Sequence, residues 1–333
     1  MNDLLVEFGD RLIGGLSRVA VTTASRWAET YRRTKEGGHW SHWTCPWAIE
    51  WLDARVDRAV ILKAAQMRAT ETMLSKGMFC NDVLKRDVLY VLPNKSPDAS
   101  DFSSARFDAA VVASPYLTKL YDKANVGHKR TGVANFYIRG GQSRAGLKSV
   151  PVFMLVLDEL DEMHPDNIPL AYERTSGQVE KEIWELSTPT IPEFGIAKSY
   201  EDTSQEHFFF QCPKCSKWTE LSYPECLVVV GDDPSSTRTL KESHIVCKEC
   251  RGVLPHAAKR EFLSKGRWVP GIEGREKRGF YINQLYSMTM QPGEIAASVI
   301  KATLSEIDEQ ELHNSKLAMP HATKGSRVTE AQV

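Results

Sequence analysis

Residues 152–159 read VFMLVLDE, six apolar residues followed by two acids. An apolar run of this length is typical of a strand that is buried on both faces of a parallel sheet. Such a strand carries Asp158 and Glu159 to its carboxyl end, where ligands bind in open α/β sheets. Asp158 can hold Mg²⁺ on the phosphates of a nucleotide, and Glu159 can orient and deprotonate an attacking water. The alternative is a strand that simply ends in surface acids, as we expect for Asp161 and Glu162.

Further short runs with strand character lie on both sides of this stretch, and helical patterns separate them. The runs cover 59–62, 88–92, 135–138 and 182–186, and the helical patterns cover 70–78, 98–121 and the chain from about 289 to 317. This alternation predicts an α/β fold with a mostly parallel sheet flanked by helices. We divide the chain into an N-terminal helical segment (1–55), a nucleotide-binding core (56–206), a zinc-binding unit (207–256), and a last strand with a helical linker (257–333).

The segment between the first strand and the first helix of this sheet is the position of a phosphate-binding loop. It consists of Lys63, Ala64, Ala65, Gln66, Met67, Arg68, Ala69, Thr70 and Glu71. The pattern G-x-x-x-x-G-K-[ST] is not matched, because Arg68 and Ala69 stand at the second glycine and the lysine. Thr70 keeps the position whose hydroxyl ligates Mg²⁺. Lys63 and Arg68 are the two candidates for the missing positive charge.

Ser187-Thr188-Pro189-Thr190 follows the last apolar run. In nucleotide-driven motors this position often senses the γ-phosphate. A turn supported by Ser, Thr and Pro is the alternative interpretation.

The chain has seven cysteines, and four of them form two C-x-x-C pairs, Cys212/Cys215 and Cys247/Cys250. Two such pairs predict a closed, structural zinc site with four thiolates. The 31 residues between the pairs leave room for a hairpin and a loop, with its turn at 231–235. Cys226 is expected to be a spare thiol, and His207, His244 and His256 flank the site.

Composition limits the other functions. The net charge of -1 argues against a generic binder of nucleic acid, so any DNA contact must come from local basic clusters, at 128–130, 139–148 and 259–278. The first residues lack the pattern of a signal peptide and no run suits a membrane helix, so we expect an intracellular protein.

The N-terminal segment is rich in tryptophan. We expect these side chains to pack the segment onto the core, or one of them to stack on a nucleotide base; they are Trp27, Trp40, Trp43, Trp47 and Trp51.

With these elements in order, the chain resembles the large terminase subunits of tailed phages, in particular the lambda-like group. The resemblance runs from about Arg26 to the end and rests on ASRWAE, KAAQMRATE, GGQSRAGLKS, VLDELD, STPT, the two cysteine pairs and GFYINQLYS.

This resemblance implies a P-loop NTPase of the ASCE type with an inserted zinc ribbon, which hydrolyses ATP to drive double-stranded DNA into a procapsid. It implies Asp158 as Mg²⁺ ligand, Glu159 as catalytic carboxylate and 187–189 as coupling motif. Lys63 is favoured as the displaced basic residue, with Arg68 as a rival. A catalytic arginine from the same or a neighbouring subunit is expected, with Arg139 and Arg144 as candidates.

The resemblance further implies a ring of identical subunits, a portal protein and a small terminase subunit as partners, and the cytoplasm of the infected bacterium as location. The family's nuclease domain is expected beyond Val333. A helicase-like translocase is excluded because no room remains for a second motor domain. The other alternative is a zinc-ribbon DNA-binding or scaffold protein whose nucleotide site has decayed.

Overall fold

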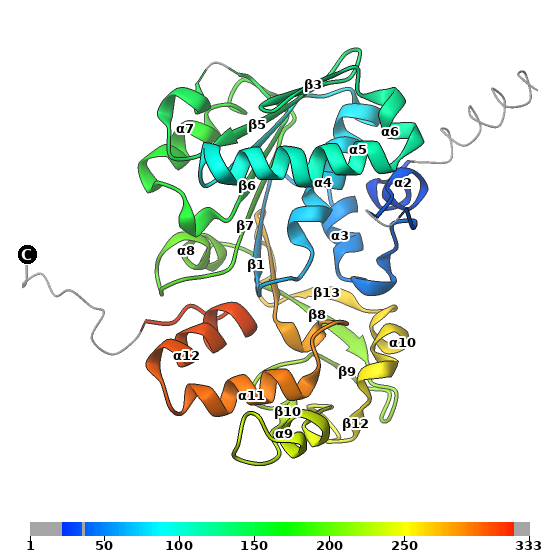
Figure 1. The fold of residues 1–333 in the computed structure, drawn as a ribbon, viewed down its shortest axis with the longest axis vertical. Helices are drawn as coiled ribbons and strands as arrows, with labels where there is room; N and C mark the ends of the chain where they lie inside the picture. Colours follow the sequence, from blue (N-terminus) through cyan, green and yellow to red (C-terminus); the bar gives the residue numbers. More distant parts are fainter. Residues whose placement is uncertain (1–21, 35–36, 149, 323–333) are drawn as a thin grey trace, which may run out of the picture.

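The computed structural model describes residues 22–34, 37–148 and 150–322. Its centre is a sheet in which six neighbouring strands run parallel, in the order β14-β1-β7-β6-β2-β5 (Figure 1). These strands are β1 (Arg58–Lys63), β2 (Val88–Leu92), β5 (Asn135–Gly140), β6 (Met154–Asp158), β7 (Glu182–Ser187) and β14 (Arg278–Ile282). The mixed α/β fold with a mostly parallel sheet that the sequence predicts is therefore confirmed.

Further strands, most of them antiparallel, extend this sheet at both edges. On the β14 side lie β8 (Glu206–Gln211), β13 (Arg267–Pro270) and β9 (Trp218–Thr219), and on the β5 side lie β4 (His128–Arg130) and β3 (Lys123–Asn125). β8 pairs parallel with β14 and antiparallel with β13 and β9, so the chain that leads into the cysteine pairs starts inside the main sheet.

Both faces of the sheet are buried, which explains the continuous apolar runs. Along β6, Met154 and Val156 belong to one hydrophobic cluster, whereas Leu155 and Leu157 belong to another on the opposite face. The first cluster includes residues of α2 (Ala24–Tyr31), α3 (Ala48–Asp53), α4 (Ala69–Phe79), α5 (Ala109–Ala113) and α6 (Pro115–Leu120). The second includes residues of α7 (Ile168–Tyr172) and α8 (Gly195–Glu201).

The N-terminal tryptophans pack the segment onto this core, as the sequence indicates. Trp27, Trp47 and Trp51 are fully buried, Trp40 is nearly so, and Trp43 is exposed. Residues 1–21 of the predicted helical segment, with the start of the chain that we compared with a signal peptide, lie outside the described residues.

The region 98–121 is helical, as predicted. It begins with two π-helical segments, η3 (Lys95–Ala99) and η4 (Phe102–Asp108), and continues into α5 and α6. Stacking of Phe102 on Tyr90 of β2, with ring centroids 4.4 Å apart, holds η4 against the sheet.

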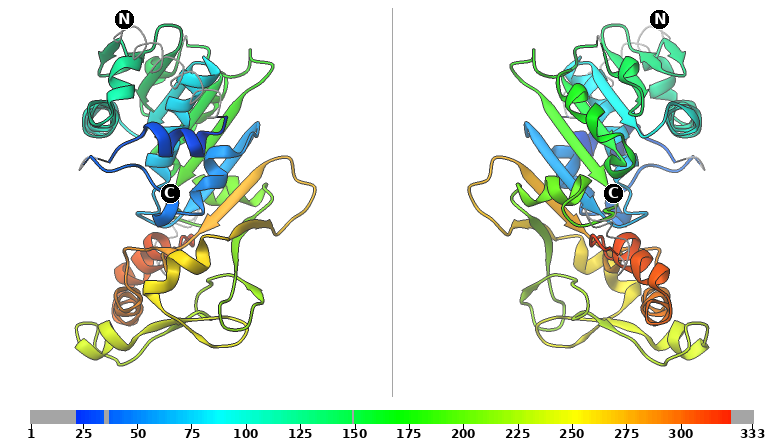
Figure 2. Two further views of the ribbon diagram at one scale, coloured as in Figure 1. Left: turned by 90° about the vertical axis from the view of Figure 1, so that its right-hand side faces the viewer. Right: turned by 90° about the vertical axis from the view of Figure 1, so that its left-hand side faces the viewer.

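Much of the chain between β8 and β14 forms a second lobe next to the sheet (Figure 2). It contains a three-stranded sheet of β10 (Leu227–Val228), β11 (His244–Val246) and β12 (Val253–Leu254), with α9 (Thr237–Glu242) and α10 (Lys259–Leu263). The predicted turn at 231–235 leads into α9 instead of closing a hairpin directly, because Ser236 caps a helix there by accepting from the Thr239 N–H.

The C-terminal helices pack beside this lobe. They are α11 (Pro292–Ala302), α12 (Glu306–Glu311) and the π-helical turn η10 (Leu312–Lys316). α11 lies between α9 and α12. Within the described part of the chain, no helix is long and apolar enough to cross a bilayer.

Candidate functional site

The phosphate-loop position is a tight turn between β1, which ends at Lys63, and α4, which begins at Ala69. Gln66 and Arg68 have left-handed backbone, with φ of 63° and 64°. Glycine enters this region without steric cost, whereas a side chain is strained there. The backbone at Arg68 therefore has a conformation that suits the glycine of the usual pattern.

Distant segments hold this turn in place. The N–H of Ala64 donates to the carbonyl of Ile282 at 2.9 Å, and the N–H of Ala65 donates to the carbonyl of Ser315 at 2.8 Å. The indole of Trp47 donates to the carbonyl of Met67 at 3.2 Å. The loop is thus fixed by β14, by η10 and by the N-terminal segment.

The first turn of α4 offers an anion-binding end. The N–H of Thr72 is the first that bonds back along the chain, to the carbonyl of Arg68 at 3.0 Å. The N–H groups before it have no acceptor within the helix, and the helix dipole makes this end positive. Because Thr70 in this turn lines a pocket, the end of α4 can face a phosphate group.

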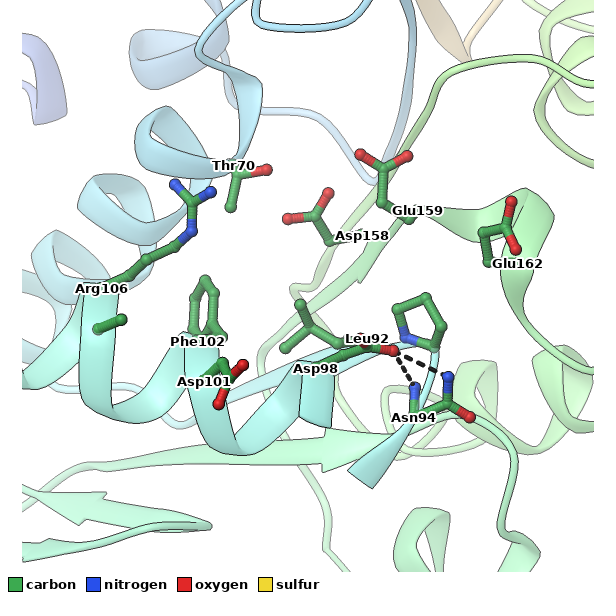
Figure 3. A pocket seen from close by; sticks show the side chains of 12 residues that line it. Thr70, Leu92, Asn94, Asp98, Asp101, Phe102, Arg106, Asp158, Glu159 and Glu162 are labelled. Carbon is green, nitrogen blue, oxygen red and sulfur yellow. Dashed lines mark hydrogen bonds between the residues drawn. The ribbon is translucent and has the colours of Figure 1, made fainter. Parts of the chain in front are cut away.

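The pocket has a volume of about 620 Å³ and lies at the carboxyl ends of β2 and β6. In Figure 3, Thr70, Asp158 and Glu159 lie toward the top of the view and Asp101 and Phe102 lie below them on η4, while the side chain of Arg106 extends from the same helix toward Thr70. Its lining residues are Thr70, Leu92, Pro93, Asn94, Asp98, Asp101, Phe102, Ala105, Arg106, Asp158, Glu159 and Glu162.

Asp158 is a buried carboxylate with one oxygen to spare. The hydroxyl of Tyr90 donates to its Oδ2 at 2.6 Å. Its Oδ1 is buried and has no hydrogen bond of normal geometry among the described residues, although the Thr70 hydroxyl lies near enough to lower the pKa of the carboxyl slightly. Burial, and secondly the charge of Glu159, raise the pKa of Asp158 to about 6. The spare oxygen can accept a further ligand or donor. Because the ionised form of Asp158 is disfavoured here, a cation bound next to it would stabilise the carboxylate.

Glu159 turns away from the strand with a φ of 58° and joins two other candidate residues. Its Oε1 accepts from the ammonium group of Lys63 at 2.8 Å. Its Oε2 lies 3.4 Å from both the Ser187 hydroxyl and the Thr188 N–H, which donate to it. The Lys63 ammonium group also donates to the Thr188 hydroxyl at 3.3 Å. The ends of β1, β6 and β7 thus converge on one carboxylate.

Lys63 and Arg68, the two candidates for the missing charge, differ in environment. The side chain of Lys63 is 6% exposed and points to Glu159. Arg68 is exposed on the far end of the turn. Of the two, Lys63 is the one that lies among the other candidate residues.

Arg106 is a residue that the sequence did not single out. It lies on η4 and lines the pocket that contains Thr70 and Asp158 (Figure 3). Its guanidinium group donates to Oε1 of Glu71 at 3.0 Å, and Arg32 binds the other oxygen of Glu71 at 2.8 Å. No local motif marks Arg106, because only the folding of η4 over β2 brings it to the pocket.

The two arginines predicted from the sequence lie elsewhere. Arg144 is exposed on the short helix η5 (Arg144–Leu147) and does not line the pocket. Arg139 donates to the carbonyls of Gly127 and Ile138, so its guanidinium group braces the β4–β5 hairpin.

The expectation that Asp161 is a solvated acid is wrong. Its Oδ2 accepts from the N–H and the hydroxyl of Thr190, at 2.9 and 2.8 Å, and its Oδ1 accepts from the Ile196 N–H at 2.7 Å. Gly195 has a φ of 51°, and a Cβ there would collide with this carboxylate. Asp161 therefore ties the acidic strand end to the turn after β7 and to the start of α8.

The four paired cysteines come together as predicted. The sulfur atoms of Cys212, Cys215, Cys247 and Cys250 all lie within 4.8 Å of one another. A tetrahedral zinc site with Zn–S bonds of ~2.3 Å needs sulfur atoms ~3.8 Å apart, and Cys212 and Cys250 are 4.0 Å apart. The cluster is compatible with zinc.

The two cysteine turns have the same construction. The Sγ of Cys212 accepts from the Lys214 N–H at 3.4 Å, and the Sγ of Cys247 accepts from the Glu249 N–H at the same distance. Such N–H donors stabilise thiolates. Cys226 is buried outside this cluster, where its thiol lies 3.4 Å from the carbonyl of Glu220.

Comparison with known protein families identifies the family of the chain. A family model described as "Phage terminase large subunit gpA, ATPase domain" matches residues 34–268, which is more than half of the chain. Among curated proteins nothing matches.

Several solved structures are similar. The large terminase ATPase domain of Thermus phage P74-26 is 10% identical, with 86% of this chain and 95% of that chain covered and a TM-score of 0.49. The large terminase of bacteriophage HK97 is 12% identical, with 54% of this chain covered and a TM-score of 0.46. The match covers only 40% of the HK97 protein.

Proposed function

The chain belongs to the phage terminase large subunits and carries their gpA-type ATPase domain, and from this premise we propose that it hydrolyses ATP to drive double-stranded DNA into a procapsid. The observation that carries the proposal is the meeting of Lys63, Glu159 and Thr188, from the ends of three adjacent parallel strands, beside the spare oxygen of Asp158. Strand ends that meet beside a helix N-terminus are a common position for phosphate binding, which supports the proposal.

The residues beside β6 fit a magnesium ion. Asp158 offers a buried oxygen without a partner, and Thr70 offers a hydroxyl in the same pocket. Oxygen donors that leave most positions to water and phosphate are the set that Mg²⁺ prefers. Bound there, the ion would neutralise charge on the β- and γ-phosphates. Asp158 and Thr70 would hold it.

We assign the other roles by position. The phosphates would lie on residues 64–71, with Lys63 as the basic partner. Glu159 would orient and deprotonate the attacking water once Lys63 is drawn to the phosphates. Ser187 and Thr188 contact Glu159 directly, so they can respond to the loss of the γ-phosphate. Arg106 is an additional candidate for the catalytic arginine of the same chain, and Arg144 stays the candidate for a neighbouring subunit.

We propose the same domain division as from the sequence, with boundaries at 55, 206 and 256. The four-cysteine cluster supports a structural zinc ribbon in the third unit. The ribbon would carry no chemistry of its own, because four thiolates close the zinc coordination.

The proposal includes a ring of identical subunits, a portal protein, a small terminase subunit and the cytoplasm of the infected bacterium. These follow from membership of the family. The HK97 large terminase is more than twice the length of the segment that this chain matches, so the action of the whole protein on DNA is part of the proposal.

The second candidate is a DNA-binding or scaffold protein with a decayed nucleotide site. Two observations favour it. The loop lacks the two glycines of the usual pattern and has Ala69 at the position of its lysine, and Lys63 and Glu159 are paired with each other, so neither is free for a nucleotide or a water. ATP turnover separates the two. We expect slow, Mg²⁺-dependent hydrolysis that DNA and the partner proteins stimulate. If the chain neither binds nor hydrolyses ATP with DNA and its partners present, the motor function must be abandoned.

A further inference from the structure

A second group of metal-binding side chains lies in the C-terminal helices, far along the chain from the cysteines. Glu309, His313 and His321 place one ligand atom each within 4.8 Å of one another, and all three are half-buried. We propose that these three residues form a second metal site, for a divalent ion of the zinc class. The proposal does not depend on ATP hydrolysis.

The helix supplies two of the ligands in a geometry suited to one ion. Glu309 lies in α12 and His313 lies in η10, which continues it. Residues four apart lie on the same face of a helix, about 5–6 Å apart at their Cβ atoms. The carboxylate and the imidazole can therefore reach the same point.

A chain reversal supplies the third ligand. Ala318 is fully buried with a φ of 55°, and the N–H of Met319 donates back to the carbonyl of His313 at 2.8 Å. This turn brings the His321 ring onto the His313 ring, with centroids 4.6 Å apart and an angle of 12° between the planes. Nε2 of His321 is 3.7 Å from Oε1 of Glu309. The backbone, and not the side chains alone, sets this arrangement.

The donor set determines the kind of ion. Two imidazoles and one carboxylate are a common ligand set of zinc and of similar late divalent ions, which leaves one position for water. Mg²⁺ prefers oxygen donors and keeps its waters, so the nucleotide's ion would not compete well here. The first turn of α12 also carries Glu306 and Asp308, whose charges favour a cation nearby.

The proposed metal site lies next to the turns of the nucleotide site. The backbone N–H of His321 donates to the carbonyl of Thr190 at 3.0 Å, in the turn that follows β7. The carbonyl of Ser315, between the two histidines, accepts from the N–H of Ala65 in the phosphate-loop turn. An ion held by His313 and His321 would cross-link the two ends of the intervening segment. This segment contacts both the turn after β7 and the phosphate-loop turn. Metal binding would therefore fix the C-terminal segment to the nucleotide site.

Titration of the intact protein with Co²⁺ and Zn²⁺ tests the proposal. Thiolate-bound Co²⁺ absorbs strongly through sulfur-to-metal charge transfer, whereas nitrogen and oxygen ligands give only weak visible bands, so the two sites are spectrally distinct. With the cysteine cluster already filled, we expect one further equivalent of metal without a thiolate band. His313→Ala and His321→Ala should each bind this equivalent ~100-fold more weakly, because loss of even an outer-shell partner costs about 10–100-fold.

Glu311→Gln is the matched control, because Glu311 is an exposed acid of the same helix and lies outside the group. It should keep the second equivalent. Trypsin cleavage after Lys316, which lies between the histidines, should slow when Zn²⁺ is added to wild type and stay unchanged in both histidine variants. Glu309→Gln, which keeps the shape of the side chain, should behave as the histidine variants do. The proposal is overturned if wild type binds no second equivalent, or if both histidine variants bind it as wild type does.

Discussion

The ammonium group of Lys63 lies 2.8 Å from Oε1 of Glu159, so the two groups that we propose for the phosphates and for the attacking water neutralise each other in this structure. Lys63 is buried, whereas the Glu159 side chain is 39% exposed. Bound phosphate would compete for the lysine and leave the glutamate free to act as a base. In the proposed mechanism, the pair would couple nucleotide binding to the release of the Glu159 carboxylate.

Lys63→Ala and Arg68→Ala should have unequal effects on ATP binding. Loss of a buried, charge-assisted contact to phosphate costs about 1.5–3 kcal/mol, or ~10-fold to 100-fold in affinity. Arg68 is exposed and makes no side-chain contact with the acidic pair, so its removal should change the affinity by less than ~3-fold. Binding of a fluorescent ATP analogue measures both. Equal losses in the two variants would mean that both residues serve the phosphates.

Glu159→Gln should abolish hydrolysis and preserve nucleotide binding. The amide keeps the shape of the side chain but cannot accept a proton from water, and loss of a general base costs about 10²–10⁴-fold in rate. Glu162→Gln is the control, because Glu162 lines the same pocket and makes no contact with Lys63. Single-turnover ATP hydrolysis distinguishes them. A Glu159→Gln protein with wild-type turnover would remove this residue from the mechanism.

The strands and the acidic pair could be predicted from the sequence, because both depend on local pattern. A strand buried on two faces is mostly apolar, so the runs that became β1, β2 and β6 stand out in the sequence. β7 departs from this pattern, because it buries Glu182 and Glu185, which pair with Arg55 and Arg58. The start of β6 at Met154, two residues later than the apolar run, was not predictable, since Phe153 and Met154 both donate to the carbonyl of Asp87 outside the ladder.

Residues that meet only through the tertiary fold could not be predicted. Tyr90 lies in the middle of an apolar strand, and nothing in that strand indicates that its hydroxyl will bind Asp158. Asp161 has the same local sequence character as Glu162, yet only Asp161 is held by the turn after β7. Arg106 lies on a helix whose docking against β2 depends on aromatic stacking.

ATP hydrolysis should lose activity as the pH falls through about 6. The pKa of Asp158 is raised to about 6, chiefly by burial, and a protonated carboxyl cannot ligate Mg²⁺. The expected acid limb of kcat/KM for ATP therefore has a midpoint near this pH, as measured by initial rates from pH 5 to 8. Activity that is constant down to about pH 5 would contradict the assignment of Asp158 as the metal ligand.

The free energy of unfolding of the nucleotide-free protein should change with pH in the opposite direction to the rate of ATP hydrolysis. Because the pKa of Asp158 is raised in the folded state, the contribution of Asp158 to stability is present at low pH and is lost as the pH rises from about 4 to about 6. Asp158→Asn removes this loss and should raise the free energy of unfolding above pH 6 by up to about 3 kcal/mol. Urea unfolding of wild type and variant at pH 4 and pH 7.5 measures the difference, which should appear only at the higher pH.

Arg106→Ala should lower kcat by ~10³-fold if its guanidinium group neutralises charge on the transferred phosphoryl group. The fold should tolerate the change, because Glu71 keeps its ion pair with Arg32. Arg130→Ala, which breaks an exposed ion pair with Asp122, is the control and should have normal turnover.

Mixing of variants separates an arginine of the same chain from one of a neighbour. Arg106→Ala mixed with Glu159→Gln should stay inactive, since every site lacks one of the two groups. Arg144→Ala mixed with Glu159→Gln should regain activity, since a site at their boundary has both. Recovery in the first mixture would place Arg106 in the neighbour's site instead.

Cys212→Ser should remove the tightly bound zinc and unfold the surrounding unit. Wild-type protein washed with a weak chelator should retain about one zinc per chain, because four thiolates hold the ion far more tightly than two imidazoles and a carboxylate do. Hydrogen exchange over 207–256 should rise in the variant, while β1 and β6 stay protected, since these strands lie within the parallel sheet and do not contact the cysteine turns. Cys226→Ser is the control, because Cys226 lies in the same unit but outside the cluster and should leave the zinc content unchanged. If Cys212→Ser keeps its zinc, the cysteine pairs do not form the site, and the order of this lobe must come from its buried apolar residues, which belong to the larger hydrophobic cluster of the sheet.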